Sequence, residues 1–152
     1  MSARLPCLTP ADLGAALDGR LPPPGARISL LGGSFNPAHD GHREISETAL
    51  RRIGLDRVWW LVSPQNPLKP ADGRAPQAVR SAQARRAVGD PRCLGAGVEA
   101  RRGSTYASDS LRALVHLLQR VRFVWLMGAD NLIEVHLWQD WPQIFNSLPV
   151  AV

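Results

Sequence analysis

The feature that most constrains the fold is a short apolar run that ends in two glycines and leads into a helical pattern. Ile28 to Leu31 is predicted to be a strand, and Gly32 and Gly33 follow it directly. Between residues 41 and 53, apolar side chains recur at positions 45, 49, 50 and 53, which is the spacing of an amphipathic helix. A strand that passes through glycines into a helix is the first half of a βα unit.

The same alternation continues along the chain. Further strands are predicted over 58–62, 93–98, 122–127 and 148–152, and helices over 76–88, with its arginines outward, over 108–118 and over 138–145. Alternating strands and helices indicate an α/β domain with a twisted parallel sheet and flanking helices. Ligands of such sheets bind beyond the carboxyl ends of the strands, so functional residues are expected directly after strands.

The first 26 residues read as an N-terminal extension. Thr9 and Pro10 form a helix-start signal, and the segment LPPPG at 21–25 reads as a stiff spacer. Residues 1–26 are therefore predicted to be an extension with a proline-rich linker, and the domain proper is predicted to span residues 27–152.

Composition narrows the class of protein. The chain has 152 residues with 45% hydrophobic and 20% charged residues, which fits one globular domain and not a disordered chain. It contains no run of 18 apolar residues, and its first residues, MSARLPCLTP, do not form a secretory signal. The two cysteines lie far apart, so we expect a reducing compartment, the cytoplasm, and no membrane partner.

The net charge of +5 favours an anionic ligand. The arginines occur as separate pairs at 51–52, 85–86 and 101–102, and no block of five like charges is present. This pattern is typical of solvated faces and argues against a nucleic-acid partner. Oligomeric state is not determined by the sequence.

The segment LLGGSFNPAHDGH, from Leu30 to His42, matches neither common phosphate loop. It lacks the third glycine of GxGxxG and the lysine of GxxxxGK[ST], and it offers two histidines instead. In nucleotidyl transfer the attacking phosphate is already anionic, so no general base is needed. The protein aligns the substrates and stabilises the charge that develops, and imidazole N–H donors at a helix start suit that task.

This segment resembles the HxGH signature, GGSFxPxHxGH, of the nucleotidyltransferase superfamily, which has a Rossmann-like fold. Three further segments are similar to the bacterial nicotinate-mononucleotide adenylyltransferases: WWLVSPQNPLK from Trp59, TYASDSL from Thr105, and MGADNL with HLWQDW from Met127. The resemblance covers residues 28–152. It implies adenylyl transfer from ATP to nicotinate mononucleotide, giving deamido-NAD and pyrophosphate, with Mg²⁺ accompanying ATP.

The resemblance also implies roles for individual residues. His39 and His42 would bind the ATP phosphates and stabilise the transition state. The ATP site would further include Gly33, Ser34, Phe35 and Lys69. Nicotinate mononucleotide would meet the backbone around Tyr106 and Ala107, the Asp130 carboxylate at its ribose, and the Trp138 ring at its pyridinium, where a cation over an indole face is favourable. No bound structural metal is implied.

Other interpretations of these residues stay open from sequence alone. The two histidines could be a metal pair with Asp40 or Glu44, although no third ligand is evident. Trp138 and Trp141 could form one packed helix face, and Asp130 could simply cap a helix. Another adenylyl or cytidylyl transferase, or an inactive nucleotide-binding protein, could carry the same HxGH segment.

The sequence departs from the family pattern at two places. Ala107 and Ser110 stand where the family usually has threonine. The family's ISSTxIR segment, which binds ATP and follows a strand like LPVAV, is absent before Val152. The domain is therefore expected to lack its C-terminal part.

Overall fold

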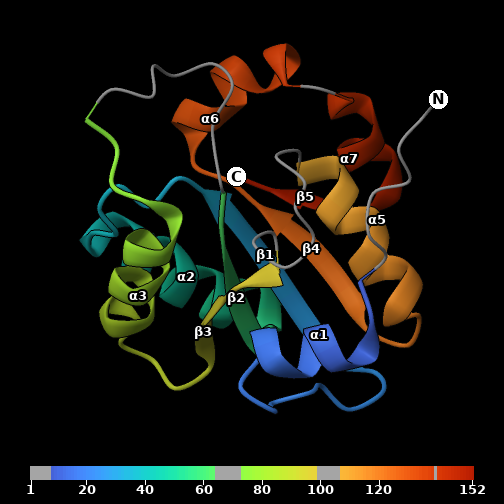
Figure 1. Ribbon diagram of the computed structural model, residues 1–152. Helices are drawn as coiled ribbons and strands as arrows, with labels where there is room; N and C mark the ends of the chain where they lie inside the picture. Colours follow the sequence, from blue (N-terminus) through green and yellow to red (C-terminus); the bar gives the residue numbers. More distant parts are fainter. Residues whose placement is uncertain (1–7, 64–72, 99–106, 139) are drawn as a thin grey trace, which may run out of the picture.

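The computed structural model describes residues 8–63, 73–98, 107–138 and 140–152. Its centre is a five-stranded sheet in the order β3-β2-β1-β4-β5, with all four neighbouring pairs parallel (Figure 1). The strands are β1 (Arg27–Gly33), β2 (Arg57–Val62), β3 (Cys93–Ala96), β4 (Arg122–Leu126) and β5 (Val150–Ala151). The predicted α/β fold with a parallel sheet is thereby confirmed.

Helices cover both faces of the sheet (Figure 1). They are α1 (Pro10–Ala16), α2 (Asp40–Ala49), α3 (Gln77–Ala87), α5 (Ala107–Leu117), α6 (Ala129–Glu134) and α7 (Trp141–Ser147). A π-helical turn, Leu50–Gly54, extends α2, and a 3₁₀ turn, Val135–Leu137, follows α6. None of the helices in the described ranges is long and apolar enough to cross a membrane.

The core consists of two apolar clusters because successive strand residues point to opposite faces. Trp59 packs with α1 and α5 in one cluster, whereas Trp60 packs with α2 and α3 in the other. Both rings are fully buried, as is Trp125 on β4. The three strand tryptophans are therefore core residues, as the sequence indicated.

Helix α1 belongs to the first of these clusters. Thr9 caps it and exchanges hydrogen bonds with Asp12, and Pro10 is its first residue, as predicted. Its apolar side chains Leu13 and Ala16 are buried against the sheet. The boundary after residue 26 stays a prediction, but the segment before it contributes side chains to the domain core.

Two helical predictions were wrong in detail. The helix over 76–88 exists, but its arginines do not all face outward, because Arg80 is only 1% exposed. The last helix begins at Trp141 and not at residue 138, because the chain first forms α6 and the 3₁₀ turn. Trp138 therefore follows a turn in extended conformation and does not share a helix with Trp141.

Candidate active site

The site forms where β1 ends and α2 begins. Because β1 and β4 are parallel neighbours, the chain leaves both strands at the same edge of the sheet. Helix α2 follows β1, and α6 follows β4 (Figure 1). The residues predicted from the glycine–histidine segment and from MGADN thus share the carboxyl edge of the sheet.

Glycine is required at two positions of the first turn. A Cβ atom at Gly32 would collide with the Trp125 ring on the neighbouring strand. A Cβ atom at Gly41 would lie 2.8 Å from Cε1 of His39, closer than side chains tolerate. Gly32 thus permits the close approach of β1 and β4, and Gly41 leaves room for the His39 ring over the start of α2.

The two histidines cap the helix reciprocally. His39 is the N-cap residue, and its Nδ1 accepts a hydrogen bond from the Gly41 N–H at 3.1 Å. Nδ1 of His42 accepts a hydrogen bond from the His39 N–H, also at 3.1 Å. These bonds satisfy backbone donors that a helix start leaves free. In each neutral ring the proton is then on Nε2, which is left to donate to a ligand.

Packing fixes the inner imidazole. The His42 ring lies 4.0 Å from the His39 ring and 4.4 Å from the Phe35 ring, measured between centroids. Phe35 is buried, has φ of 48° and stacks on Trp60 of β2 at 5.2 Å. Behind these rings, Trp60 donates to the Ser46 hydroxyl, and that hydroxyl donates to the His42 carbonyl.

The protonation state of His42 follows from this environment. Burial, and next the nearby His39, lower the pKa of His42 from 6.5 to about 4. The Asp130 carboxylate opposes this shift weakly, so it lies within electrostatic range of the ring. At neutral pH His42 is an uncharged hydrogen-bond donor.

The MGADN turn supplies the other described candidates. Gly128 is the N-cap of α6, and Asp130 lies exposed in the first turn, so Asp130 is not the cap itself. A Cβ atom at Gly128 would lie 2.5 Å from Oδ1 of Asp130, so the glycine makes room for this carboxylate. Trp138 is half-buried and packs against the first core cluster.

Two predicted site residues, Lys69 and Tyr106, lie outside the described residues, and for Ala107 only its position as the first residue of α5 is described. The described ranges contain no group of three or more His, Cys, Asp or Glu side chains that could hold a metal ion. The alternative of a metal pair built on His39 and His42 therefore gains no third ligand from the described part of the chain.

Sequence reasoning missed Arg80, the buried arginine of α3. Its guanidinium donates to the carbonyl oxygens of Ser34 at 2.6 Å, Ser63 at 2.7 Å and Ala75 at 2.8 Å. Ser34 and Ser63 directly follow β1 and β2, at the same edge as the histidines. No signal in the sequence indicated this residue, because α3 contains several arginines and no sequence pattern distinguishes Arg80 from the exposed Arg85 and Arg86.

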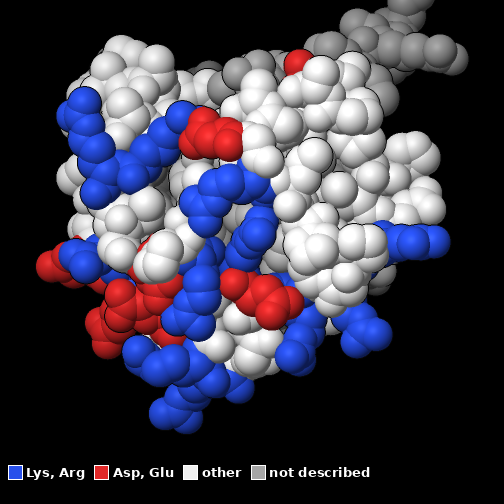
Figure 2. Space-filling view, turned by 90° about the horizontal axis from the view of Figure 1, so that it is seen from below, with Lys and Arg blue, Asp and Glu red and all other residues white. Residues whose placement is uncertain are grey.

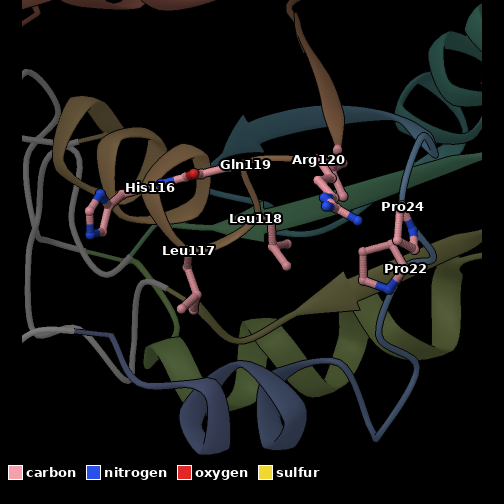
Figure 3. Close-up of a pocket in the computed structure, with 8 residues that line it drawn as sticks. Pro22, Pro24, His116, Leu117, Leu118, Gln119 and Arg120 are labelled. Atoms are coloured by element: carbon pink, nitrogen blue, oxygen red, sulfur yellow. The ribbon is translucent and has the colours of Figure 1, made fainter.

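The opposite edge of the sheet has a different character. A surface pocket there lies between Pro22 and Pro24, before β1, and the end of α5 with His116 and the turn after it with Arg120 (Figure 3). Figure 2, seen from below, shows arginines interleaved with carboxylates. Ion pairs such as Arg92 with Asp90 at 2.7 Å and Arg85 with Asp18 at 3.4 Å join the two kinds of charge. None of the predicted site residues lines this pocket.

Comparisons with known proteins show which family the chain is similar to. A family model described as cytidylyltransferase-like matches residues 30–152. A relative from Parvibaculum lavamentivorans, named probable nicotinate-nucleotide adenylyltransferase, is 52% identical over 85% of this chain and 64% of its own length. A relative of the same name from Methylorubrum extorquens is 53% identical over 83% of this chain and 68% of its own length.

The fold also matches a solved structure. A nicotinic acid mononucleotide adenylyltransferase from Plasmodium falciparum, complexed with NaAD, superposes with a TM-score of 0.64 at 14% identity. The match covers 78% of this chain and 60% of that protein. The chain thus spans about two thirds of the length of the curated relatives it matches.

Proposed function

Because the chain belongs to the cytidylyltransferase-like family, we propose that it transfers an adenylyl group from ATP to nicotinate mononucleotide. The products are nicotinate adenine dinucleotide and pyrophosphate, and the reaction serves NAD biosynthesis in the cytoplasm. The names of the relatives support this substrate pair. The observation that carries the proposal is the pair of imidazoles that cap α2 through Nδ1 and keep Nε2 for a ligand.

The reaction needs charge stabilisation more than proton transfer. A phosphate oxygen of the mononucleotide attacks the α-phosphorus of ATP, and the bond from that phosphorus to the pyrophosphate oxygen breaks. Negative charge grows on the phosphoryl oxygens and on the leaving group. His42, neutral because of its lowered pKa, and His39 donate Nε2–H groups to these oxygens.

The ATP subsite extends from the histidines along the turn after β1. The backbone of Gly33, Ser34 and Phe35 presents N–H groups to the phosphates. The start of α2 adds the positive end of its helix dipole, and Lys69 adds a positive charge. Mg²⁺ accompanies ATP as part of the substrate, because the divalent cation binds the oxygens of the triphosphate.

The mononucleotide subsite adjoins the ATP subsite at the neighbouring strand. Asp130 accepts hydrogen bonds from the ribose hydroxyls, and its electrostatic effect on His42 supports this proximity. Trp138 stacks on the pyridinium ring of the nicotinate, and the backbone around Tyr106 and Ala107 meets its carboxylate. No nucleic-acid partner is required for this reaction.

The test is product formation by the purified chain with ATP, Mg²⁺ and either nicotinate or nicotinamide mononucleotide. We expect dinucleotide from the acid form, and a rate lower by about 100-fold or more in His42→Ala. His116→Ala is the matched control, because His116 is an exposed histidine at the opposite edge. Its rate should equal that of the unmodified chain.

Other outcomes would contradict the proposal in distinct ways. Product from CTP in place of ATP would indicate a cytidylyl transferase. Binding of nicotinate mononucleotide by calorimetry without any product would indicate a nucleotide-binding protein. An unchanged rate in His42→Ala would remove the imidazole from the mechanism.

A further inference from the structure

Arg80 is a buried arginine beside the proposed ATP subsite. It lies one turn into α3, and its side chain extends back toward the start of that helix, where it meets the Ala75 carbonyl. From there Nη1 reaches the Ser34 carbonyl of the turn after β1 and the Ser63 carbonyl after β2. One guanidinium thus joins the start of α3 to the turns that follow β1 and β2.

Neighbouring hydrogen bonds hold the same three segments together. The Ala75 N–H donates to Oδ1 of Asn36 at 3.3 Å, and Gln77 donates from Nε2 to the Val62 carbonyl at 3.0 Å. The Ser63 N–H donates to the Gly33 carbonyl at 2.9 Å. The turn after β1 is therefore anchored from α3 as well as from β2, and Arg80 is the buried centre of this anchor.

The bond from Arg80 has a directional consequence for the next residue. In a trans peptide the carbonyl and the N–H point in opposite directions. Since the Ser34 carbonyl faces Arg80, the N–H of Phe35 in the same peptide faces away from it. Among the residues that the structure describes, this N–H has no hydrogen-bond partner, and the ring of its own residue contacts His42.

We propose that Arg80 is a positioning residue that orients the Ser34–Phe35 peptide so that the Phe35 N–H faces the triphosphate of ATP. Phe35 has φ of 48°, a conformation that side chains rarely adopt unaided. Arg80 holds this peptide through its hydrogen bond to the Ser34 carbonyl, while the Phe35 ring packs against the His42 imidazole. The inference rests on the proposed function, and it adds a residue that does not itself touch the substrate.

The test is Arg80→Lys, with Arg86→Lys as its matched control. Lysine keeps the positive charge but cannot reproduce a planar fork of donors. Arg86 lies on the same helix and is exposed, so the same change there alters no anchor. We expect calorimetry to show the Kd for Mg²⁺–ATP raised about 10-fold or more in Arg80→Lys, and the Kd for nicotinate mononucleotide changed less than about twofold.

A merely structural role would give a different result. In that case Arg80→Lys would lower the melting temperature and weaken both ligands equally, or leave both unchanged, and either outcome overturns the inference. A second measurement needs no variant. In the unmodified chain, the ¹⁵N–¹H resonance of Phe35 should shift on addition of Mg²⁺–ATP, and an unmoved resonance in an ATP-bound chain overturns the inference even if Arg80→Lys does not fold.

The two proposals fail in different ways. An unmodified chain that binds no ATP overturns the proposed function, and the inference about Arg80 falls with it. An unmodified chain that binds ATP, together with an Arg80→Lys variant that binds it equally well, overturns only the inference about Arg80.

Discussion

The two turns at the carboxyl edge of the sheet, after β1 and after β4, differ in how firmly they are held. The β1–α2 turn has a buried Phe35, two capping imidazoles and the Arg80 anchor. The β4–α6 turn leads into a six-residue helix that has no side-chain cap and no buried residue. The first turn is held by buried and capping side chains, whereas the second shows no comparable anchor among the residues that the structure describes.

This contrast agrees with the chemistry proposed for each turn. Charge stabilisation in a transition state requires donors that are already in place, because reorganising them during the reaction costs rate. Recognition of a ribose or a pyridinium ring tolerates adjustment on binding. A rigid turn around the histidines and a lightly anchored turn around Asp130 therefore suit their separate tasks.

The largest expected effect concerns stability at the two turns. Phe35→Ala should lower the free energy of unfolding by about 3–5 kcal/mol, because a fully buried aromatic ring is removed. Ile133→Ala on α6 should change it by less than about 0.5 kcal/mol, because Ile133 is 75% exposed. Urea unfolding followed by tryptophan fluorescence measures both, and similar losses would contradict the contrast between the turns.

The next effect separates capping from chemistry at His39. Asparagine is a favourable N-cap residue, so His39→Asn should keep the stability of α2, whereas His39→Ala should cost about 1 kcal/mol. Both variants lack the imidazole donor, so both should form dinucleotide about 100-fold more slowly. Urea unfolding and a product assay measure the two quantities. A His39→Asn variant with full activity would show that the ring serves only as a cap.

Much of the fold followed from local pattern. The apolar runs at β1, β2 and β4 are short, strongly hydrophobic and bounded by glycine or polar residues, so their strand character needs no tertiary information. Alternation with helical segments then fixes parallel pairing, and parallel pairing fixes the edge at which a ligand binds. The location of His39 and His42 was predictable for this reason.

The parts that sequence did not predict depend on tertiary contacts. The sequence around Arg80 is like that around the exposed arginines of the same helix. Only its hydrogen bonds to the carbonyls of two turns distant in sequence distinguish it. The reciprocal cap by two histidines is not a usual capping pair, since such boxes combine Ser or Thr with Glu or Gln. The short α6 carries exposed apolar side chains, so its pattern gave no sign of a packed helix.

The smallest effect tests whether the two turns meet at His42. With a pKa near 4, folded His42 stays neutral while the unfolded chain takes up a proton below pH 6.5. The titration of His42 therefore leaves the free energy of unfolding unchanged above pH 6.5 and lowers it as the pH falls from 6.5 toward 4. This pH dependence is modest because solvent reaches part of the His42 ring. His42→Gln should remove the pH dependence.

The pKa of His42 in the folded chain can be measured by NMR, from the pH at which its Cε1–H resonance is halfway through its titration shift. His39→Asn removes the imidazole that lowers the pKa of His42 and should raise this pKa, whereas Asp130→Asn removes the carboxylate that raises it and should lower it. Opposite shifts would place the charges of both turns around one imidazole. If the pKa of His42 is unchanged in Asp130→Asn, the β4–α6 turn lies too far from the histidines to act on them. The mononucleotide would then need a different ribose partner.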